Sequence, residues 1–183
     1  GFELARAVAA AGLPMTAAPG PTATICALTL SGLPSDRFLF AGFLPATASA
    51  RRTALEELAG VQATLILYES PKRLAALLAD AASTLGGARQ AAICRELTKR
   101  FEEVLRGTLA ELAEATSARD LKGEIVVLID RAAPSAATED QIAAALDSAL
   151  ATLSVKDAAT FVSQTLKVSR KIVYSIALSR SQD

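Results

Sequence analysis

The clearest hydrophobic pattern in the chain lies between residues 64 and 87. Thr64 to Tyr68 is apolar and rich in strand formers, which predicts a buried strand. Ser70 then occupies an N-cap position, and Pro71 occupies the first helical position. Apolar residues follow at helical spacing until two glycines end the helix: Leu74, Leu77, Leu78, Ala81, Ala82 and Leu85, then Gly86 and Gly87. The pattern predicts a strand, a tight turn and a helix.

The turn within this unit carries polar side chains that are candidates for chemistry. They are Tyr68, Glu69, Lys72 and Arg73. Open α/β sheets bind ligands at the carboxyl ends of their strands, so we interpret this turn as a candidate site. From spacing alone, a solvated β–α turn is the simpler interpretation of the same residues.

Shorter patterns on either side predict the other elements of an α/β chain. Helices are expected over residues 2–11, 22–31, 46–60 and 108–116, and strands over 15–18, 38–41, 90–95, 101–105 and 124–130. The last strand is almost wholly aliphatic, which predicts that helices or neighbouring segments cover both of its faces. A Pro-Gly-Pro-Thr turn at residues 19–22 leads into the second helix, where Thr22 is a candidate cap.

The last quarter of the chain has a different pattern. Residues 131–137 have the composition of a linker, and three amphipathic helices are expected over 139–152, 154–166 and 170–179. Two short helices across a tight turn match the outline of a helix-turn-helix. Residues 151–183 hold five cations against two acids, a local net charge of +3: Lys156, Lys167, Arg170, Lys171 and Arg180 against Asp157 and Asp183. This composition suits a weak phosphate-contacting surface, and a helical cap packed on the main domain suits it as well.

Composition limits the chemistry. The 183 residues are 51% hydrophobic and 4% aromatic, with zero net charge, no histidine and two cysteines. Lack of histidine removes the commonest general base and zinc ligand, and two lone cysteines cannot build a structural zinc site, so no metal site is predicted. Cys26 and Cys94 lie in apolar surroundings and are expected as buried residues of a reducing compartment. No membrane span or signal pattern is found, which predicts a cytoplasmic protein. The chain begins at Gly1 without methionine, which predicts a fragment.

Two arginines stand in an unfavourable place for a helix. Arg51 and Arg52 fall near the start of the predicted 46–60 helix, where positive charge opposes the helix dipole. This arrangement suggests an anionic partner, although two solvated arginines account for it equally well.

Several motifs occur together in order: PGPTA, LSGLPSDRF followed by GFLP, TLILYESPKRL, RELTKRFEEVLRGTLAEL and GEIVVLI. Together they resemble the tetrapyrrole-methylase superfamily of S-adenosylmethionine-dependent methyltransferases, and in particular its ribosomal RNA branch. The resemblance implies an α/β fold with a mixed five-stranded sheet flanked by helices and a small C-terminal helical extension. It also implies three parts: residues 1–33 as the end of an N-terminal cofactor domain, 34–131 as the C-terminal methylase domain and 138–183 as the extension. The family's N-terminal glycine-rich loops are absent from the chain.

The resemblance also implies site residues. The cofactor S-adenosylmethionine is expected beside Gly20, Pro21, Thr22, Gly32, Leu33, Pro34, Tyr68, Glu69, Gly123, Glu124 and Ile125. RNA is expected to meet the basic residues Arg51, Arg52, Lys72, Arg73, Arg95 and Lys99. Among the carboxylates, Glu69 or Glu96 is expected to orient substrate. Each carboxylate also has a purely structural alternative. Glu69 then only caps a helix, and Glu96 then only pairs with Arg95 or Lys99.

The function implied is methylation of the ribose 2′-hydroxyl of a cytidine in the decoding region of small-subunit rRNA. The expected partners are a 30S-like particle and a second copy of the chain in a homodimer. The isolated fragment is expected to be inactive. Two alternatives stay open, a tetrapyrrole or other small-molecule methylase of the same fold and a non-catalytic RNA-binding or dimerisation fragment. The clustered basic turns favour RNA over an apolar tetrapyrrole.

Overall fold

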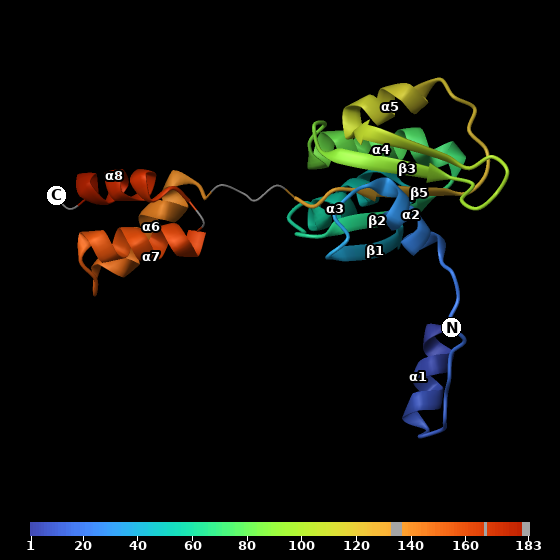
Figure 1. Cartoon of the computed structure of the whole chain (residues 1–183), viewed down its shortest axis with the longest axis horizontal. Helices are drawn as coiled ribbons and strands as arrows, with labels where there is room; N and C mark the ends of the chain where they lie inside the picture. The colour runs from blue at the N-terminus through green and yellow to red at the C-terminus, as the bar shows by residue number, and fades with distance from the viewer. Residues whose placement is uncertain (133–136, 167, 181–183) are drawn as a thin grey trace. The chain divides into compact units, whose positions relative to one another are not determined.

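The computed structural model describes residues 1–132, 137–166 and 168–180, with the side chains of 179 and 180 left out. The chain divides into two compact units, residues 1–132 and 133–183 (Figure 1). The predicted linker at 131–137 falls mostly on residues 133–136, outside the described part, as do Lys167 and Asp183. No helix in the described part is both long and apolar enough to cross a membrane.

A five-stranded sheet organises the first unit. Its strands are β1 (Phe38–Phe43), β2 (Thr64–Glu69), β3 (Gln90–Arg95), β4 (Glu103–Thr108) and β5 (Ile125–Ile129), in the order β1-β2-β5-β3-β4. The β1–β2 pair is parallel, while β5 runs antiparallel to both of its neighbours. The predicted mixed five-stranded sheet is confirmed. The aliphatic strand β5 lies at its centre, where all five residues are buried.

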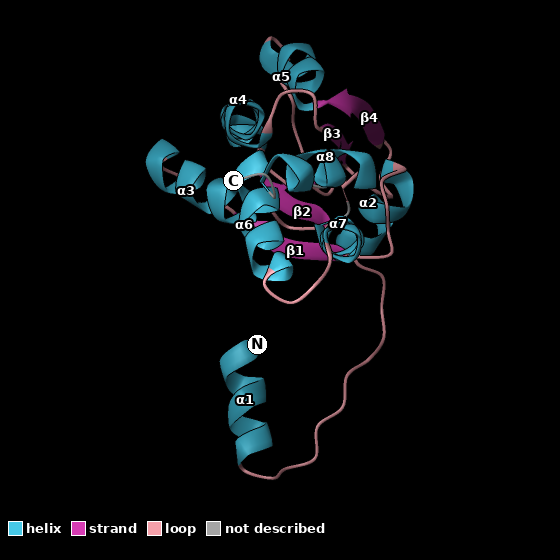
Figure 2. Ribbon diagram, turned by 90° about the vertical axis from the view of Figure 1, so that its left-hand side faces the viewer, coloured by secondary structure: helices cyan, strands magenta, loops and turns pink. Residues whose placement is uncertain are grey.

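Alternate residues along the strands define two packed faces. Leu65, Leu67, Ile93 and Val127 belong to one core cluster, whereas Ile66, Ala92, Cys94 and Val126 belong to the other. The first face is covered by α3 (Ala48–Leu58), α4 (Pro71–Leu85) and α5 (Leu109–Ser117), and the second by α2 (Ala23–Ser31). Figure 2 shows these helices on opposite sides of the strands.

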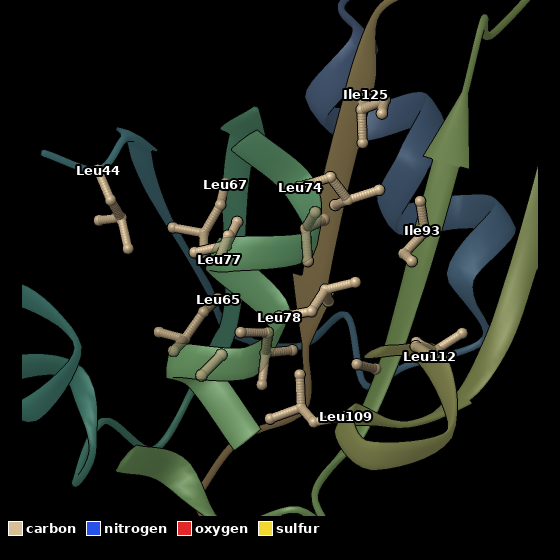
Figure 3. Packing of buried hydrophobic residues seen from close by; sticks show 14 of the residues in the cluster. Leu44, Leu65, Leu67, Leu74, Leu77, Leu78, Ile93, Leu109, Leu112 and Ile125 are labelled. Atoms are coloured by element: carbon tan, nitrogen blue, oxygen red, sulfur yellow. The ribbon is translucent and has the colours of Figure 1, made fainter. Parts of the chain in front are cut away.

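Helix α4 supplies the centre of the larger core. Leu74, Leu77 and Leu78 recur at helical spacing, are at most 1% exposed, and point toward the sheet in Figure 3. Burial of each leucine contributes roughly 1.5–3 kcal/mol. Ser70 lies at the N-cap as expected, but its side chain makes no capping hydrogen bond.

Some predicted elements differ from the structure. Residues 15–18 form no strand, since a strand needs a neighbour for its backbone groups and these residues are exposed without one. Strand β4 begins at Glu103 rather than residue 101 and includes Arg106–Gly107, because it pairs residue for residue with β3 from Arg95↔Glu103 to Gln90↔Thr108. Helix α1 (Phe2–Ala10) forms as predicted, yet it buries no residue.

The proposed division at residue 33 stays a prediction. In the structure α2 packs on β3, β4 and β5, so it shares a core with the strands that follow it. The expectation of two buried cysteines holds fully only for Cys94, whose thiol pKa burial raises to about 11, while Cys26 is half-buried.

The second unit is a bundle of α6 (Glu139–Leu150), α7 (Val155–Leu166) and α8 (Arg170–Arg180). It has its own core, to which each helix contributes: Ile142, Leu146, Ala149, Ala158, Ala159, Val162, Val173 and Ala177. A capping box begins α6, where Thr138 Oγ1 accepts the Gln141 N–H and the Gln141 side chain accepts the Thr138 N–H.

Candidate functional site

A hollow of about 470 Å³ opens at the carboxyl end of β2. Strand β5 runs antiparallel to β2, so its first residues lie beside the last residues of β2, with Glu69 opposite Ile125. The beginnings of α2 and α4 complete the walls. The lining residues are Ala23, Phe43, Tyr68, Glu69, Ser70, Pro71, Gly123, Glu124, Ile125 and Val126.

This hollow brings together five of the residues expected at the cofactor. They are Tyr68, Glu69, Gly123, Glu124 and Ile125. Of the predicted Pro-Gly-Pro-Thr turn, none lines the hollow, but Thr22 directly precedes the lining residue Ala23. Thr22 is the N-cap of α2 as expected, without a capping hydrogen bond from its side chain.

Gly32, Leu33 and Pro34 do not line this hollow, and their expected cofactor contact stays a prediction. Gly32 is the left-handed C-cap of α2, at the end of the helix away from Ala23. The Pro34 carbonyl accepts the hydroxyl of Thr64, the first residue of β2, at 2.6 Å. These residues therefore lie at the opposite end of β2 from Glu69. The Gly-Leu-Pro motif has a structural role: Gly32 ends α2, and Pro34 contacts the first residue of β2.

Tyr68 is fixed on the hollow's wall by a hydrogen bond and by aromatic contacts. Its hydroxyl lies 2.8 Å from Thr24 Oγ1, and its ring meets Phe40 and Phe43 edge to face. Phe43 was not among the expected site residues. The signal that marks it is the Gly-Phe-Leu-Pro sequence at 42–45, which directly leaves the parallel neighbour of β2.

Glu69 is a buried carboxylate with unused hydrogen-bonding capacity. It is 3% exposed, and its Oε1 accepts the Ser70 N–H at 2.7 Å and the Ser70 hydroxyl at 3.3 Å. Arg73 Nη2 lies 3.2 Å from Oε2, close enough for an ion pair. Within the described part of the chain, however, Oε2 has no hydrogen-bond partner. The ion pair with Arg73 offsets part of the cost of burying this oxygen, and a ligand that donates a hydrogen bond to it adds favourable free energy.

Arg73 has structural partners of its own. Its Nη2 donates to the Leu44 carbonyl at 2.6 Å and to the Pro45 carbonyl at 3.2 Å. The guanidinium thus ties the chain after β1 to the first turn of α4. Its neighbour Lys72 is exposed and lines a separate hollow of about 240 Å³. Of these two expected RNA contacts, only Lys72 presents its charge fully to solvent.

Glu96 holds backbone in place, and its expected role in orienting substrate stays a prediction. Its carboxylate accepts the Glu124 N–H at 2.9 Å and the Lys99 ammonium at 2.9 Å, and the Glu124 carbonyl accepts the Glu96 N–H. The hydrogen bond from the Glu124 backbone, followed by that from Lys99, holds the pKa of Glu96 below its ordinary value. Its side chain faces a different hollow, beside the first.

That second hollow, of about 610 Å³, shares Gly123 with the first. Arg95 lies there, where its Nε donates to Glu103 at 3.1 Å and its Nη1 to the Lys122 carbonyl at 3.2 Å. Five further lining residues were missed in the sequence: Phe101, Arg119, Asp120, Leu121 and Lys122. Phe101 is 62% exposed, although the sequence pattern predicted a strand there and so did not mark it as a candidate for a site.

Arg51 is buried and ion-paired, and its expected RNA contact stays a prediction. It is 5% exposed, and its Nε donates to Asp80 Oδ2 at 2.7 Å. Arg52 Nε donates to Asp80 Oδ1 at 2.7 Å, although the Arg52 side chain remains 57% exposed. The two arginines that oppose the α3 dipole are therefore offset by a carboxylate of α4.

Comparisons with known proteins identify families and relatives that this chain resembles. The family described as tetrapyrrole (corrin/porphyrin) methylases matches residues 1–113, and the RsmI C-terminal HTH domain matches residues 136–181. The ribosomal RNA small subunit methyltransferase I of Mycobacterium bovis is 49% identical over 162 residues, covering 88% of this chain and 56% of the relative. That of Pseudomonas aeruginosa is 42% identical over 187 residues, covering 98% and 66%. The chain thus spans less than two thirds of these relatives.

Solved structures share the fold. The methyltransferase CobJ aligns with a TM-score of 0.53 at 20% identity, covering 72% of this chain and 57% of that one. The cobalt precorrin-4 methyltransferase CbiF aligns at 0.51 with 15% identity, covering 70% and 57%. No cluster of metal-binding side chains occurs among the residues that the structure describes. The predicted resemblance is confirmed, and its cofactor, S-adenosylmethionine, is the one that this family uses. On a match that covers more than half of its length, the chain belongs to the tetrapyrrole methylase family.

Proposed function

We propose that this chain is the C-terminal part of an S-adenosylmethionine-dependent methyltransferase that modifies the ribose 2′-hydroxyl of a cytidine in the decoding region of small-subunit rRNA. The hollow at the end of β2 carries the proposal. It combines an aromatic ring, a glycine turn and a buried carboxylate with an unused acceptor, which suits an adenosine with its hydroxyl or amino donors.

In this proposal the first hollow forms half of the cofactor site. The bound cofactor supplies an electrophilic methyl group. Tyr68 and Ile125 offer apolar surface to an adenine ring, and Glu69 Oε2 accepts a donor. Alignment and exclusion of water are the main contributions of the protein to a methyl transfer. Glu69 is thereby assigned to orientation, and Glu96 to holding the Gly123–Glu124 wall.

The second hollow and its surroundings form the proposed RNA surface. Arg95 lines the hollow, Lys99 lies beside it, and Lys72 and Arg52 present exposed charge elsewhere on the same unit. Arg73 and Arg51 are assigned to structure, through the carbonyls at 44–46 and through Asp80. These exposed cations suit a polyanionic substrate such as RNA.

Binding to the 183-residue chain tests the cofactor assignment. In an NMR titration with S-adenosylmethionine, we expect shifts at the amides of Tyr68, Gly123 and Ile125, with weak affinity because only half of the site is proposed here. Glu69→Gln should weaken binding, whereas Glu57→Gln on the exposed face of α3 should not. Shifts confined to other residues would refute the assignment.

Activity tests the RNA assignment. In an enzyme of full family length that carries this chain, Arg95→Ala should lower both methylation of 30S-like particles and affinity for their RNA. Wild-type values for both would refute the role of Arg95. A labelled product in which methyl occupies a base rather than the ribose would refute the 2′-hydroxyl specificity.

We also propose that the chain forms a homodimer. Strand β1 lies at the sheet edge and exposes large apolar side chains: Phe38, Leu39, Phe40 and Phe43. An exposed apolar edge strand favours association with another chain. Light scattering should give twice the monomer mass, and Phe40→Lys should reduce it to the monomer value. A monomeric wild-type chain at high concentration would contradict the proposal.

A further inference from the structure

The three-helix unit contains a hollow of its own, of about 430 Å³. Of the described residues, those that line it are Lys156, Arg170, Lys171 and Tyr174. The set contains three cations and one aromatic ring. None of the residues that line the first or the second hollow of the first unit belongs to it.

The positions of these side chains concentrate positive potential. Lys156 is the second residue of α7, and Arg170 and Lys171 are the first two residues of α8. Helix N-termini carry partial positive charge, so each of these cations adds an unfavourable interaction with its own helix. An anion in the hollow would be attracted both by the three cations and by the partial positive charge of the helix N-termini. Tyr174 follows Arg170 by four residues and Lys171 by three, which places all three on one face of α8.

No acidic residue in the described part of the unit lines the hollow. Glu139 and Asp140 occupy the first turn of α6, where negative charge stabilises the helix. Asp157 is next to Lys156, but its Oδ2 accepts the Ser154 hydroxyl at 2.6 Å and it does not line the hollow. The charged side chains that line the hollow, among the described residues, are therefore all cations.

We propose that this hollow binds the phosphodiester backbone of RNA, with the three cations contacting phosphates and the Tyr174 ring stacking on a nucleobase. Cations that meet phosphates release counterions, and aromatic rings accept unpaired bases of any sequence. The site serves as an anchor for the substrate, separate from the hollow where the cofactor is proposed. It rests on the proposed function only for the choice of RNA as the polyanion.

The side chains of the site can be removed without disturbing the fold of the unit. Lys156, Arg170, Lys171 and Tyr174 are all exposed, whereas α8 packs through Val173 and Ala177, both 0% exposed. Circular dichroism of the variants should match that of the wild-type chain.

The experiment measures the affinity of the 183-residue chain for a fluorescent single-stranded RNA across a series of salt concentrations, without cofactor. Arg170→Ala/Lys171→Ala should weaken binding and lower the slope of log affinity against log salt by about 1.4, near 0.7 for each lost phosphate contact. The matched control Arg6→Ala/Arg37→Ala changes the net charge equally at exposed positions of the other unit and should leave the slope unchanged. Equal effects of the two double variants, or no effect of the first, would overturn the proposal.

Tyr174 provides a second, independent measurement. Tyr174→Ala should weaken RNA binding by about fivefold or more and leave the salt slope unchanged, whereas Tyr174→Phe should keep wild-type affinity. Loss of affinity in both variants, or in neither, would contradict stacking. Because no cofactor is present, this site can fail while the cofactor assignment stands, and the reverse also holds.

Discussion

At the scale of single residues, Gly123 is the glycine at which an added side chain would meet the closest contacts. Its φ of +96° is one that residues with side chains rarely adopt. A Cβ there would lie 2.3 Å from the Glu96 carboxyl. The same carboxyl accepts the N–H of Glu124, so the residue that holds the wall of the hollow also fills the space beside the glycine.

Gly123→Ala should therefore lower the free energy of unfolding by more than about 1 kcal/mol, through backbone strain and the clash with Glu96. Urea denaturation measures this change. Gly60→Ala, at a position with open space and no positive φ, is the control and should change stability little. In Glu96→Ala/Gly123→Ala the clash is gone, so the loss should be smaller than the sum of the single losses. Strict additivity would contradict this geometry.

At the scale of elements, a carboxylate joins α3 to α4. Asp80 is 5% exposed and accepts hydrogen bonds from Arg51 and Arg52. Burial alone would raise the pKa of Asp80, but hydrogen bonds and charge from the two arginines outweigh it and hold the pKa below its ordinary value. A carboxyl with a lowered pKa stabilises the fold above its unfolded-state pKa and loses that contribution as pH falls through the folded-state value.

Asp80→Asn should lower the free energy of unfolding at pH 7 by about 3 kcal/mol, because Arg51 is left buried without its counter-charge. The gap between the wild-type chain and the variant should narrow as the pH falls below the ordinary pKa of a carboxyl. Chemical denaturation at a series of pH values checks both points. Asp120→Asn, at an exposed position, should show no gap at any pH. A gap that stays constant into acid would show that Asp80 is not ionised in the folded chain.

Helix caps differ in strength along the chain. At the start of α5, Thr108 Oγ1 accepts the Glu111 N–H while the Glu111 carboxylate accepts the Thr108 N–H. Thr47 occupies the same position before α3 without a capping hydrogen bond from its side chain. We expect Thr108→Ala to cost about 1 kcal/mol of stability and Thr47→Ala only a few tenths, measured by urea denaturation. Equal losses would mean that the box contributes nothing beyond N-cap propensity.

At the scale of the whole molecule, each of the core clusters in the described residues lies within one unit. The two clusters on the faces of the sheet draw on residues 27–129, and the third draws on residues 137–177. Each unit thus buries its own apolar side chains, which is the condition for separate folding.

Leu146→Ala should destabilise the helical unit by about 2–5 kcal/mol, and Leu77→Ala should do the same to the sheet unit. Hydrogen exchange resolved by residue can follow both units in one sample. Each variant should speed exchange in its own unit while amides of the other unit keep wild-type rates. Faster exchange throughout the chain in both variants would show that the units unfold together.

The sequence alone predicted the elements with strong periodicity. The strand and helix of residues 64–85 match closely because the strand is aliphatic, Pro71 is at the first helical position and two glycines follow the last turn. The capping boxes at Thr108 and Thr138 are equally local. The order of the motifs predicted the family. The family in turn predicted the mixed sheet, because members of a family share one fold.

Only the tertiary structure decided which polar residues share a site. Tyr68, Glu69 and Gly123 meet because β5 inserts antiparallel beside β2, a pairing between segments more than fifty residues apart. Long-range packing also pairs Arg51 with Asp80 and places Gly32 near the other end of β2. It brings the Glu96 carboxylate to the backbone N–H of Glu124, which donates a hydrogen bond to it. The sequence shows which side chains are charged. Their partners depend on the pairing and packing of segments that are distant in the sequence, and local patterns do not reveal this.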